Sequence, residues 1–217
     1  MPIFECARCN EMTYSASMGA VTACARCGSE RQRAVDGDFD AARHSVRTLG
    51  AADHATFVYD DVATVAPFCA RFLTDGANAG ERLVAGVQDD LRQDVSGLLA
   101  PDVEAMIEWK DPRSIYGDFD ADRVAAMYDA LLGAEQRTTR ILAGLDGESA
   151  EGLDPDELAR YESMAHEIVT SRGATLVCVY DERSLPPEFI DVTARRHGLS
   201  VDESGVRRNE RFEYQPA

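Results

Sequence analysis

From residue 53 onward, short apolar runs alternate with longer segments in which apolar residues recur every three or four positions. Short apolar runs are typical of β-strands, and the longer period is typical of amphipathic helices. The predicted strands cover residues 55–59, 83–87, 103–109, 140–145 and 175–180. Because residues 176–180 are apolar throughout, this strand is expected to be buried on both faces, as in a parallel sheet between two helical layers.

The helical segments carry start and stop signals. Their apolar stripes cover residues 62–73, 91–99, 124–132 and 158–168, and a fifth helix is expected from Pro186-Pro187 to His197-Gly198. Asp120 is a candidate N-cap, and Asp154 with Glu157 three residues later is typical of a capping box. Pro67 is expected to place the start of the first helix near itself or to bend its first turn. Strand and helix thus alternate, and the predicted fold is a parallel α/β sandwich.

Polar residues follow most of the predicted strands. In open α/β sheets, ligands bind beyond the carboxyl ends of the strands. The segments expected at this edge are residues 59–61, 88–90 and 109–111, Asp146, and residues 181–182.

Four of the six cysteines lie in two copies of one tetrapeptide, Cys-Ala-Arg-Cys. The pairs are Cys6 with Cys9 and Cys24 with Cys27, separated by fourteen residues. Two residues between paired thiolates allow both sulfurs to bind one metal ion, and two such pairs complete a tetrahedron. The spacing predicts a zinc ribbon over residues 1–35 with a closed, structural Zn²⁺ site. Gly28 supplies the permissive backbone that follows such a pair, and residues 14–21 are expected to form a hairpin.

Disulfides and a redox pair are the alternatives for these cysteines. Reduced thiols are the rule in the cytosol, and a redox Cys-x-x-Cys would normally occur once, near a strand-to-helix turn. A segment of this length with so few apolar residues also needs a metal ion to fold. Zinc is therefore the favoured interpretation.

The charge argues against nucleic acid as the main partner. The 217 residues carry 39 acidic and 22 basic side chains, a formal net charge of −17, and Lys110 is the only lysine. A distributed acidic surface repels polyanions, and it suits either an arginine-rich genome or a cytoplasm of high salt. The ribbon carries a net charge of only +1, so docking to a protein or to the larger domain is the favoured use. With no apolar run of about 18 residues and no visible secretory signal, no membrane contact and a cytoplasmic location are expected.

Four common enzyme motifs are absent from the sequence. Residues 176–182 imitate the Walker B strand of P-loop ATPases, yet the phosphate loop with its Lys and Ser or Thr is missing. No GxSxG, HExxH or GxGxxG motif is present. Among the isolated histidines, His166 is expected at a helix surface and His197 in a last helical turn, where a cation suits the macrodipole. His54 begins the first strand and is expected to be structural, and Cys69 and Cys178 are expected in the core.

Four segments, taken together, resemble a known family, the MEDS domain, which is the methanogen and methylotroph sensory domain related to the sensory part of a dichloromethane-responsive regulator. They are residues 54–59 (HATFVY), 72–82 (FLTDGANAGER), 116–120 (YGDFD), and 176–181 (LVCVYD) with Pro186-Pro187. The second segment is also similar to the stretch after the phosphate loop in RecA-like clock-type ATPases. The resemblance covers about two thirds of the protein, from His54 to about Asp202.

The resemblance implies a RecA-like three-layer fold without a P-loop and a role in ligand sensing, with no catalytic residues to carry over. Members are commonly fused to a DNA-binding or kinase output, whereas here a zinc ribbon precedes the domain. The sequence therefore predicts a zinc ribbon over 1–35, a linker over 36–52 and a MEDS-like sensory domain over 53–217. The predicted protein is non-enzymatic and acts through partners.

The expected partner is a small organic ligand or a signalling protein, and a homo-oligomer is also compatible with the sequence. Candidate ligand-binding residues are His54, Tyr59, Trp109 and Tyr116, because aromatic walls with few polar groups suit small organic molecules. The alternative is that all four are packing residues. A DNA-associated transcriptional regulator that uses the ribbon is the alternative function, and it would bind duplex DNA in a strongly salt-dependent way.

Overall fold

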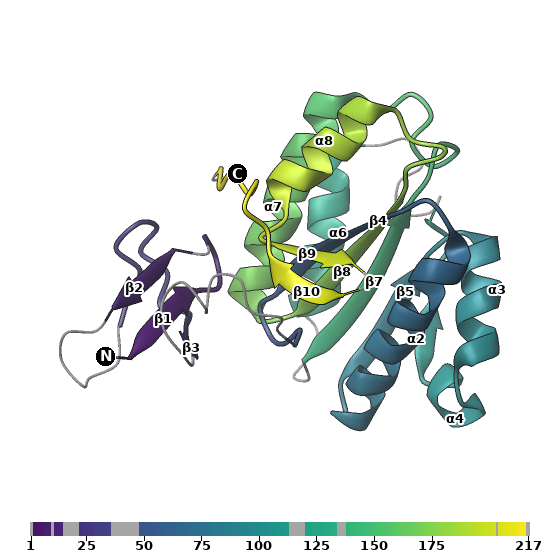
Figure 1. Ribbon diagram of the computed structural model, residues 1–217, viewed down its shortest axis with the longest axis horizontal. Helices are drawn as coiled ribbons and strands as arrows, with labels where there is room; N and C mark the ends of the chain where they lie inside the picture. The colour runs from purple at the N-terminus through teal and green to yellow at the C-terminus, as the bar shows by residue number, and fades with distance from the viewer. Residues whose placement is uncertain are drawn as a thin grey trace.

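The computed structural model describes residues 2–9, 11–14, 22–35, 48–112, 120–133, 138–202 and 204–215. These residues form a small three-stranded sheet near the N-terminus and a seven-stranded sheet flanked by helices (Figure 1). Most of the predicted linker, residues 36–47, lies outside the described residues, so the predicted domain boundaries stay predictions. None of the described helices is long and apolar enough to cross a membrane.

The small sheet is antiparallel and has the strand order β2-β1-β3. Its strands are β1 (Ile3–Cys6), β2 (Met12–Tyr14) and β3 (Gln32–Val35). Most of the segment in which a hairpin was expected, residues 14–21, lies outside the described residues. Because β1 ends at Cys6 and β3 follows the second cysteine pair, the sheet brings the two tetrapeptides to the same end.

The large sheet has the strand order β10-β9-β4-β8-β7-β5-β6. Its strands are β4 (His54–Tyr59), β5 (Arg82–Gly86), β6 (Ile107–Trp109), β7 (Thr139–Leu145), β8 (Thr175–Asp181), β9 (Leu199–Asp202) and β10 (Gly205–Arg208). All neighbouring pairs are parallel except β9 and β10, which are antiparallel. The predicted α/β fold with a mostly parallel sheet is therefore confirmed.

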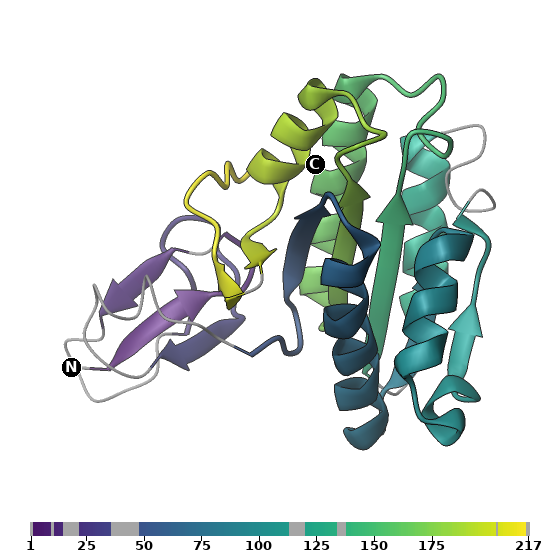
Figure 2. The ribbon, with the colours of Figure 1, turned by 45° about the vertical axis from the view of Figure 1, so that its right-hand side comes forward.

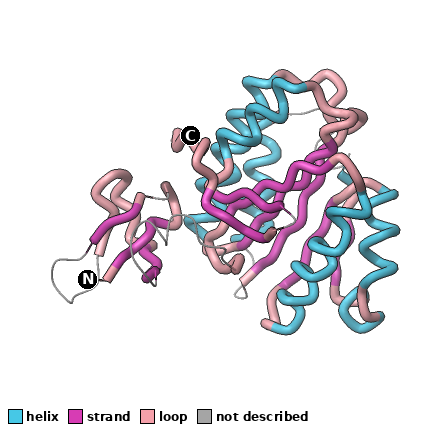
Figure 3. The backbone as a smooth tube through the Cα atoms, viewed as in Figure 1, coloured by secondary structure: helices cyan, strands magenta, loops and turns pink. Residues whose placement is uncertain are grey.

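Helices cover both faces of this sheet (Figures 2 and 3). One layer contains α2 (Val62–Asn78), α3 (Asp89–Leu98) and α4 (Pro101–Glu104), and the other contains α6 (Ala121–Gly133), α7 (Pro155–Arg172) and α8 (Pro187–Arg196). Strand β8 contributes to both apolar cores, since Val177 and Val179 pack on the α2 side while Leu176, Cys178 and Tyr180 pack on the α7 side. This alternation explains why the run is apolar at every position.

Two predicted elements differ from the structure. The predicted strand 103–109 begins too early, because Pro101 occupies the first position of the short helix α4 and only Ile107–Trp109 is extended. Helix α2 begins at Val62, five residues before Pro67, which lies inside the helix instead of near its start. The start is fixed by the Asp61 carboxylate, which accepts a hydrogen bond from Ala63 N at 2.9 Å. The two strands β9 and β10, which are short and partly polar, were not predicted.

The segment FLTDGANAGER, residues 72–82, binds the side chain of Arg140 of β7. The Arg140 guanidinium donates to Glu81 Oε2 at 2.5 Å and to the Phe72 carbonyl at 2.9 Å, and it lies 4.7 Å from the Phe72 ring centroid. Gly76 makes room for this side chain, because a Cβ there would lie 2.7 Å from Arg140 Cδ and from Leu83 Cδ2. The second family-like segment therefore holds the C-terminal half of α2 against the sheet.

The small sheet docks on the large domain through side chains of both parts. The Arg8 guanidinium donates to Glu167 of α7 at 3.0 Å, Arg31 donates to the Ser171 carbonyl at 2.6 Å, and Arg33 donates to Asp53 at 2.9 Å. The expectation that the ribbon docks to the larger domain agrees with these contacts.

One histidine prediction was wrong and another was confirmed. His166 is only 3% exposed, because the ribbon covers this face of α7 and the Arg8 carbonyl contacts His166 Nε2. His197 is the C-cap of α8, so its predicted place at the end of a helix is confirmed, and its ring is fully buried. Both rings point toward groups that are distant in the sequence.

Candidate functional site

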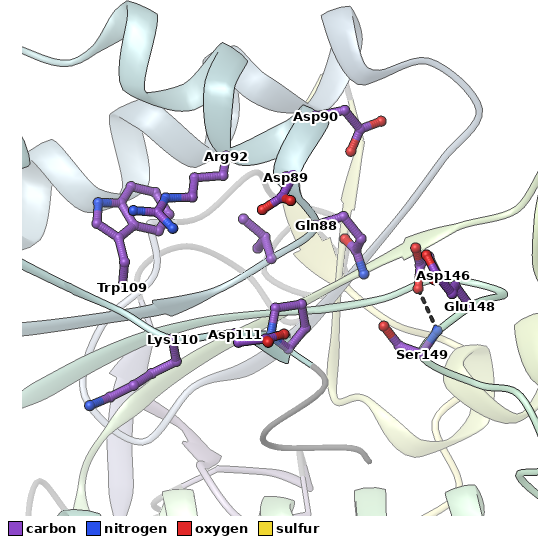
Figure 4. A pocket seen from close by; sticks show the side chains of 12 residues that line it. Gln88, Asp89, Asp90, Arg92, Trp109, Lys110, Asp111, Asp146, Glu148 and Ser149 are labelled. Carbon is purple, nitrogen blue, oxygen red and sulfur yellow. Dashed lines mark hydrogen bonds between the residues drawn. The ribbon is translucent and has the colours of Figure 1, made fainter.

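A pocket lies at the carboxyl ends of β5, β6 and β7. Its volume is about 620 Å³. The lining residues are Val87, Gln88, Asp89, Asp90, Arg92, Trp109, Lys110, Asp111, Pro112, Asp146, Glu148 and Ser149 (Figure 4). Three of the segments expected at this sheet edge, 88–90, 109–111 and Asp146, thus line one cavity.

The topology of the sheet explains the position of the pocket. Strands β5 and β7 are parallel neighbours, yet the chain leaves β5 into α3 on one face and leaves β7 toward α7 on the other. Helices that depart in opposite directions open a crevice above the two strand ends, where α/β proteins bind their ligands. The pocket occupies this switch point.

Gln88 is the most distinctive group of the pocket. It is the N-cap residue of α3, but its side chain makes no capping hydrogen bond. Both polar atoms of its amide are buried and have no hydrogen-bond partner among the described residues. The side chain lies close over β7, since a Cβ at Gly144 would come within 2.7 Å of Gln88 Oε1. Buried amides without partners are costly, so this amide is suited to a ligand that supplies both a donor and an acceptor.

Trp109 and Arg92 form one wall of the pocket. The Arg92 guanidinium carbon lies 5.0 Å from the Trp109 ring centroid, in the range of a cation–π contact, and Figure 4 shows the two side chains together. The indole N–H of Trp109 is buried and has no acceptor among the described residues. The wall therefore offers an apolar surface and a second unused donor.

Carboxylates dominate the charge around the pocket. Five line it, Asp89, Asp90, Asp111, Asp146 and Glu148, against the two cations Arg92 and Lys110. Asp146 Oδ1 accepts from Ser149 N at 2.8 Å, which fixes the turn after β7. Because like charges repel across a cavity of this size, the pocket disfavours anions and suits neutral or cationic molecules.

The neighbouring strand ends cannot cradle a phosphate in the manner of a P-loop. Only Asp60 and Asp61 connect β4 to α2, and the Asp61 carboxylate already caps the helix. Arg183 Nε and Nη2 each donate a hydrogen bond of 2.8 Å to the carboxylate of the Walker B-like Asp181. These bonds hold the pKa of that carboxyl below its ordinary value. Tyr59 is buried beside it, and burial raises the pKa of its phenol.

Three of the four predicted ligand residues are described, and they do not come together. Trp109 lines the pocket, whereas Tyr59 and His54 lie at opposite ends of β4 and line no part of it. Tyr116 lies outside the described residues. Gln88 was expected at this sheet edge as part of residues 88–90 but was not among the four ligand candidates, and Arg92 was not expected at all.

The four cysteines of the small sheet form the second candidate site. Their Sγ atoms all lie within 4.8 Å of one another, with Cys6 to Cys27 at 3.6 Å and Cys9 to Cys24 at 3.5 Å. Sulfurs bound to one tetrahedral zinc at about 2.3 Å are about 3.8 Å apart, so the set fits Zn²⁺. The Cys9 thiol lowers the pKa of Cys6 to about 4 through its hydrogen bond, which favours a first thiolate there.

The backbone around the second pair supports this arrangement. Gly28 has a φ of +73°, and its N–H donates to the Cys24 carbonyl at 2.9 Å. The expectation that this position needs a glycine is met, because L side chains rarely adopt such a backbone. The four thiols can therefore bind one metal ion, with no open coordination position.

Comparison with known proteins identifies the large domain. The model of the family described as "MEDS: MEthanogen/methylotroph, DcmR Sensory domain" matches residues 53–198. Among solved structures, the chain is similar to a crystal structure of the RadB recombinase, with 13% identity, 70% of this chain and 74% of that chain covered, and a TM-score of 0.45. No curated protein sequence matches the chain as a relative.

Proposed function

The chain belongs to the MEDS family of sensory domains, and from this premise we propose that it is a non-enzymatic sensory protein. Its α/β domain binds a small polar organic molecule, neutral or cationic, in the pocket at the ends of β5, β6 and β7. The ribbon holds one structural Zn²⁺ and serves as the interaction module toward a signalling partner. The protein acts in the cytoplasm.

The observation that carries this proposal is the unpaired amide of Gln88. A buried side-chain amide normally has partners, and here both of its polar atoms lack them among the described residues. A ligand with a donor beside an acceptor, such as an amide or an amino alcohol, would satisfy it while packing on Trp109.

The charge distribution selects the ligand class. Five carboxylates against two cations disfavour carboxylates, phosphates and nucleotides. Two observations support a non-enzymatic role. The family is one of sensory domains, and the described residues that line the pocket include neither histidine nor cysteine. Asp181, the acid that a Walker B interpretation would use, is held by Arg183.

Zinc in the ribbon would orient four thiolates and leave no site for a substrate. Its contribution is folding free energy for a sheet with few apolar residues. The contacts of the ribbon's arginines argue against the DNA-associated alternative. Arg8, Arg31 and Arg33 bind the large domain, so their charges are not available for DNA phosphates. Arg26, the fourth, pairs with Glu11 at 3.6 Å.

A thermal-shift panel on the full chain tests the ligand proposal. The probes are small amines, amides, alcohols and carboxylates at millimolar concentration. We expect members of the first three classes, and no carboxylate, to raise the melting temperature of the wild type. Gln88→Ala abolishes this rise, whereas Gln93→Ala, an exposed glutamine on the same helix outside the pocket, keeps it. If the carboxylates stabilise best, or if Gln88→Ala responds like the wild type, the proposal is wrong.

A further inference from the structure

Four buried side chains from four elements meet in the layer between the sheet and α7. They are His54 of β4, Glu162 of α7, Cys178 of β8 and His197 at the end of α8. Each is at most 2% exposed. One potential ligand atom from each lies within 4.8 Å of the others. We propose that these residues form a second metal site, a closed, structural site for Zn²⁺.

The distances between the four side chains match a tetrahedral ion. Glu162 Oε2 lies 3.3 Å from His197 Nε2 and 3.5 Å from His54 Nε2, and Cys178 Sγ lies 3.5 Å from His54 Nε2. Nitrogen, oxygen and sulfur ligands at about 2.0–2.3 Å from zinc are about 3.3–3.7 Å apart at tetrahedral angles. The cluster thus has the dimensions of a coordination sphere.

Two of the central atoms lack any other partner. Glu162 Oε2 and His197 Nε2 are buried and have no hydrogen-bond partner among the described residues. The other polar atom of each side chain has a hydrogen-bond partner outside the cluster. His197 Nδ1 donates to the Thr193 carbonyl at 2.8 Å, and Glu162 Oε1 accepts from the Tyr180 hydroxyl at 2.5 Å. A histidine whose Nδ1 donates to a carbonyl presents its Nε2 lone pair, and this is the usual support around a metal ligand.

Charge balance favours the same conclusion. A carboxylate buried to 1% exposure needs a positive charge close by, and among the described residues its near neighbours are two imidazoles, a thiol and a phenol. One divalent cation with one carboxylate, one thiolate and two neutral imidazoles has no net charge. The mixed donor set of nitrogen, sulfur and oxygen in a closed geometry suits Zn²⁺ better than Mg²⁺ or Ca²⁺, which prefer oxygen.

The site would join elements that are distant in the sequence. A metal ion here would connect α7 and the end of α8 to the central strands β4 and β8. The ribbon contacts α7 one turn after Glu162, at His166. The site shares no residue with the pocket, so it is independent of the ligand proposal. A hydrogen-bonded imidazolium–carboxylate pair without metal is the competing interpretation.

The zinc content of the full chain, purified without chelator and exchanged into metal-free buffer, tests the proposal. We expect two zinc ions per chain in the wild type and one in Glu162→Gln, which keeps the side-chain size. Glu157→Gln, an exposed glutamate on the same helix, and Cys69→Ala, the buried cysteine outside both clusters, keep two. One ion per wild-type chain, or two in Glu162→Gln, overturns the proposal.

A cobalt titration covers the case in which Glu162→Gln does not fold. The wild-type chain, stripped of metal and refolded with Co²⁺, is expected to bind two equivalents. One gives the intense sulfur-to-cobalt absorption of four thiolates, and the other gives the weaker bands of a tetrahedral site with a single thiolate. A titration that ends at one equivalent with only the four-thiolate spectrum contradicts the second site.

Discussion

The ion pair of Arg140 with Glu81 predicts a large loss of stability when one partner is removed. Arg140 is 7% exposed and Glu81 12%, so Arg140→Met would leave a nearly buried carboxylate without its cation. Breaking a buried pair costs about 3–5 kcal/mol. Since Glu81 keeps some contact with water, we expect about 3 kcal/mol, or a fall in melting temperature of roughly 6–12 °C for a chain of this size.

Two further variants isolate the cause of this loss. Arg140→Met with Glu81→Leu removes both charges, so the double variant should lose less than the sum of the single losses. Arg172→Met is the matched control, because its pair with Asp129 is about half exposed and should contribute under about 1 kcal/mol. Urea unfolding followed by circular dichroism measures the wild type, these three variants and the single variant Glu81→Leu, which completes the cycle. An Arg140→Met loss below about 1 kcal/mol, or full additivity in the double variant, would refute the reasoning.

Three further predictions concern the helix cap, the acid limb of stability and the ribbon. Asp61→Ala removes the cap of α2 and should cost about 1 kcal/mol in urea unfolding; an unchanged midpoint contradicts the cap. Arg183 lowers the pKa of Asp181 below its ordinary 3.8, so this pair adds stability at higher pH that is lost as the pH falls through and below about 4. Asp181→Asn should therefore flatten the acid limb of the pH–stability curve, and a limb of unchanged slope contradicts this role. A chelator that removes zinc from the four cysteines should expose residues 2–35 to proteolysis while the α/β domain resists, and uniform resistance argues against a structural metal there.

Local signals were sufficient to predict much of the fold. The apolar run ending at Asp181 needs no distant information, because a strand buried on both faces must be apolar at every position. The two cysteine tetrapeptides likewise carry their ligand geometry in their own spacing. Asp154 was found as a cap for the same reason, since capping depends only on the next few residues.

Tertiary contacts account for the rest. His166 occupies a position that an isolated helix would expose, and it is covered by Arg8 of the docked ribbon and by the rings of Phe212 and Tyr214 from the C-terminal segment. His54 and Tyr59 are five residues apart in the sequence, yet they are the first and last residues of the extended strand β4 and therefore lie at opposite edges of the sheet along the strand direction. Gln88 has no motif around it, and its importance follows from the two strands that meet beside it.

The most direct test of the proposed sensory pocket uses Trp109, the only tryptophan of the chain, as its reporter. Its fluorescence is titrated with each small amine, amide or alcohol that stabilises the protein. The pocket predicts a saturable change in the wild type and in Gln93→Ala that disappears in Gln88→Ala. A compound that stabilises the protein and leaves the Trp109 emission unchanged binds elsewhere, and that result would contradict a sensory site at the ends of β5, β6 and β7.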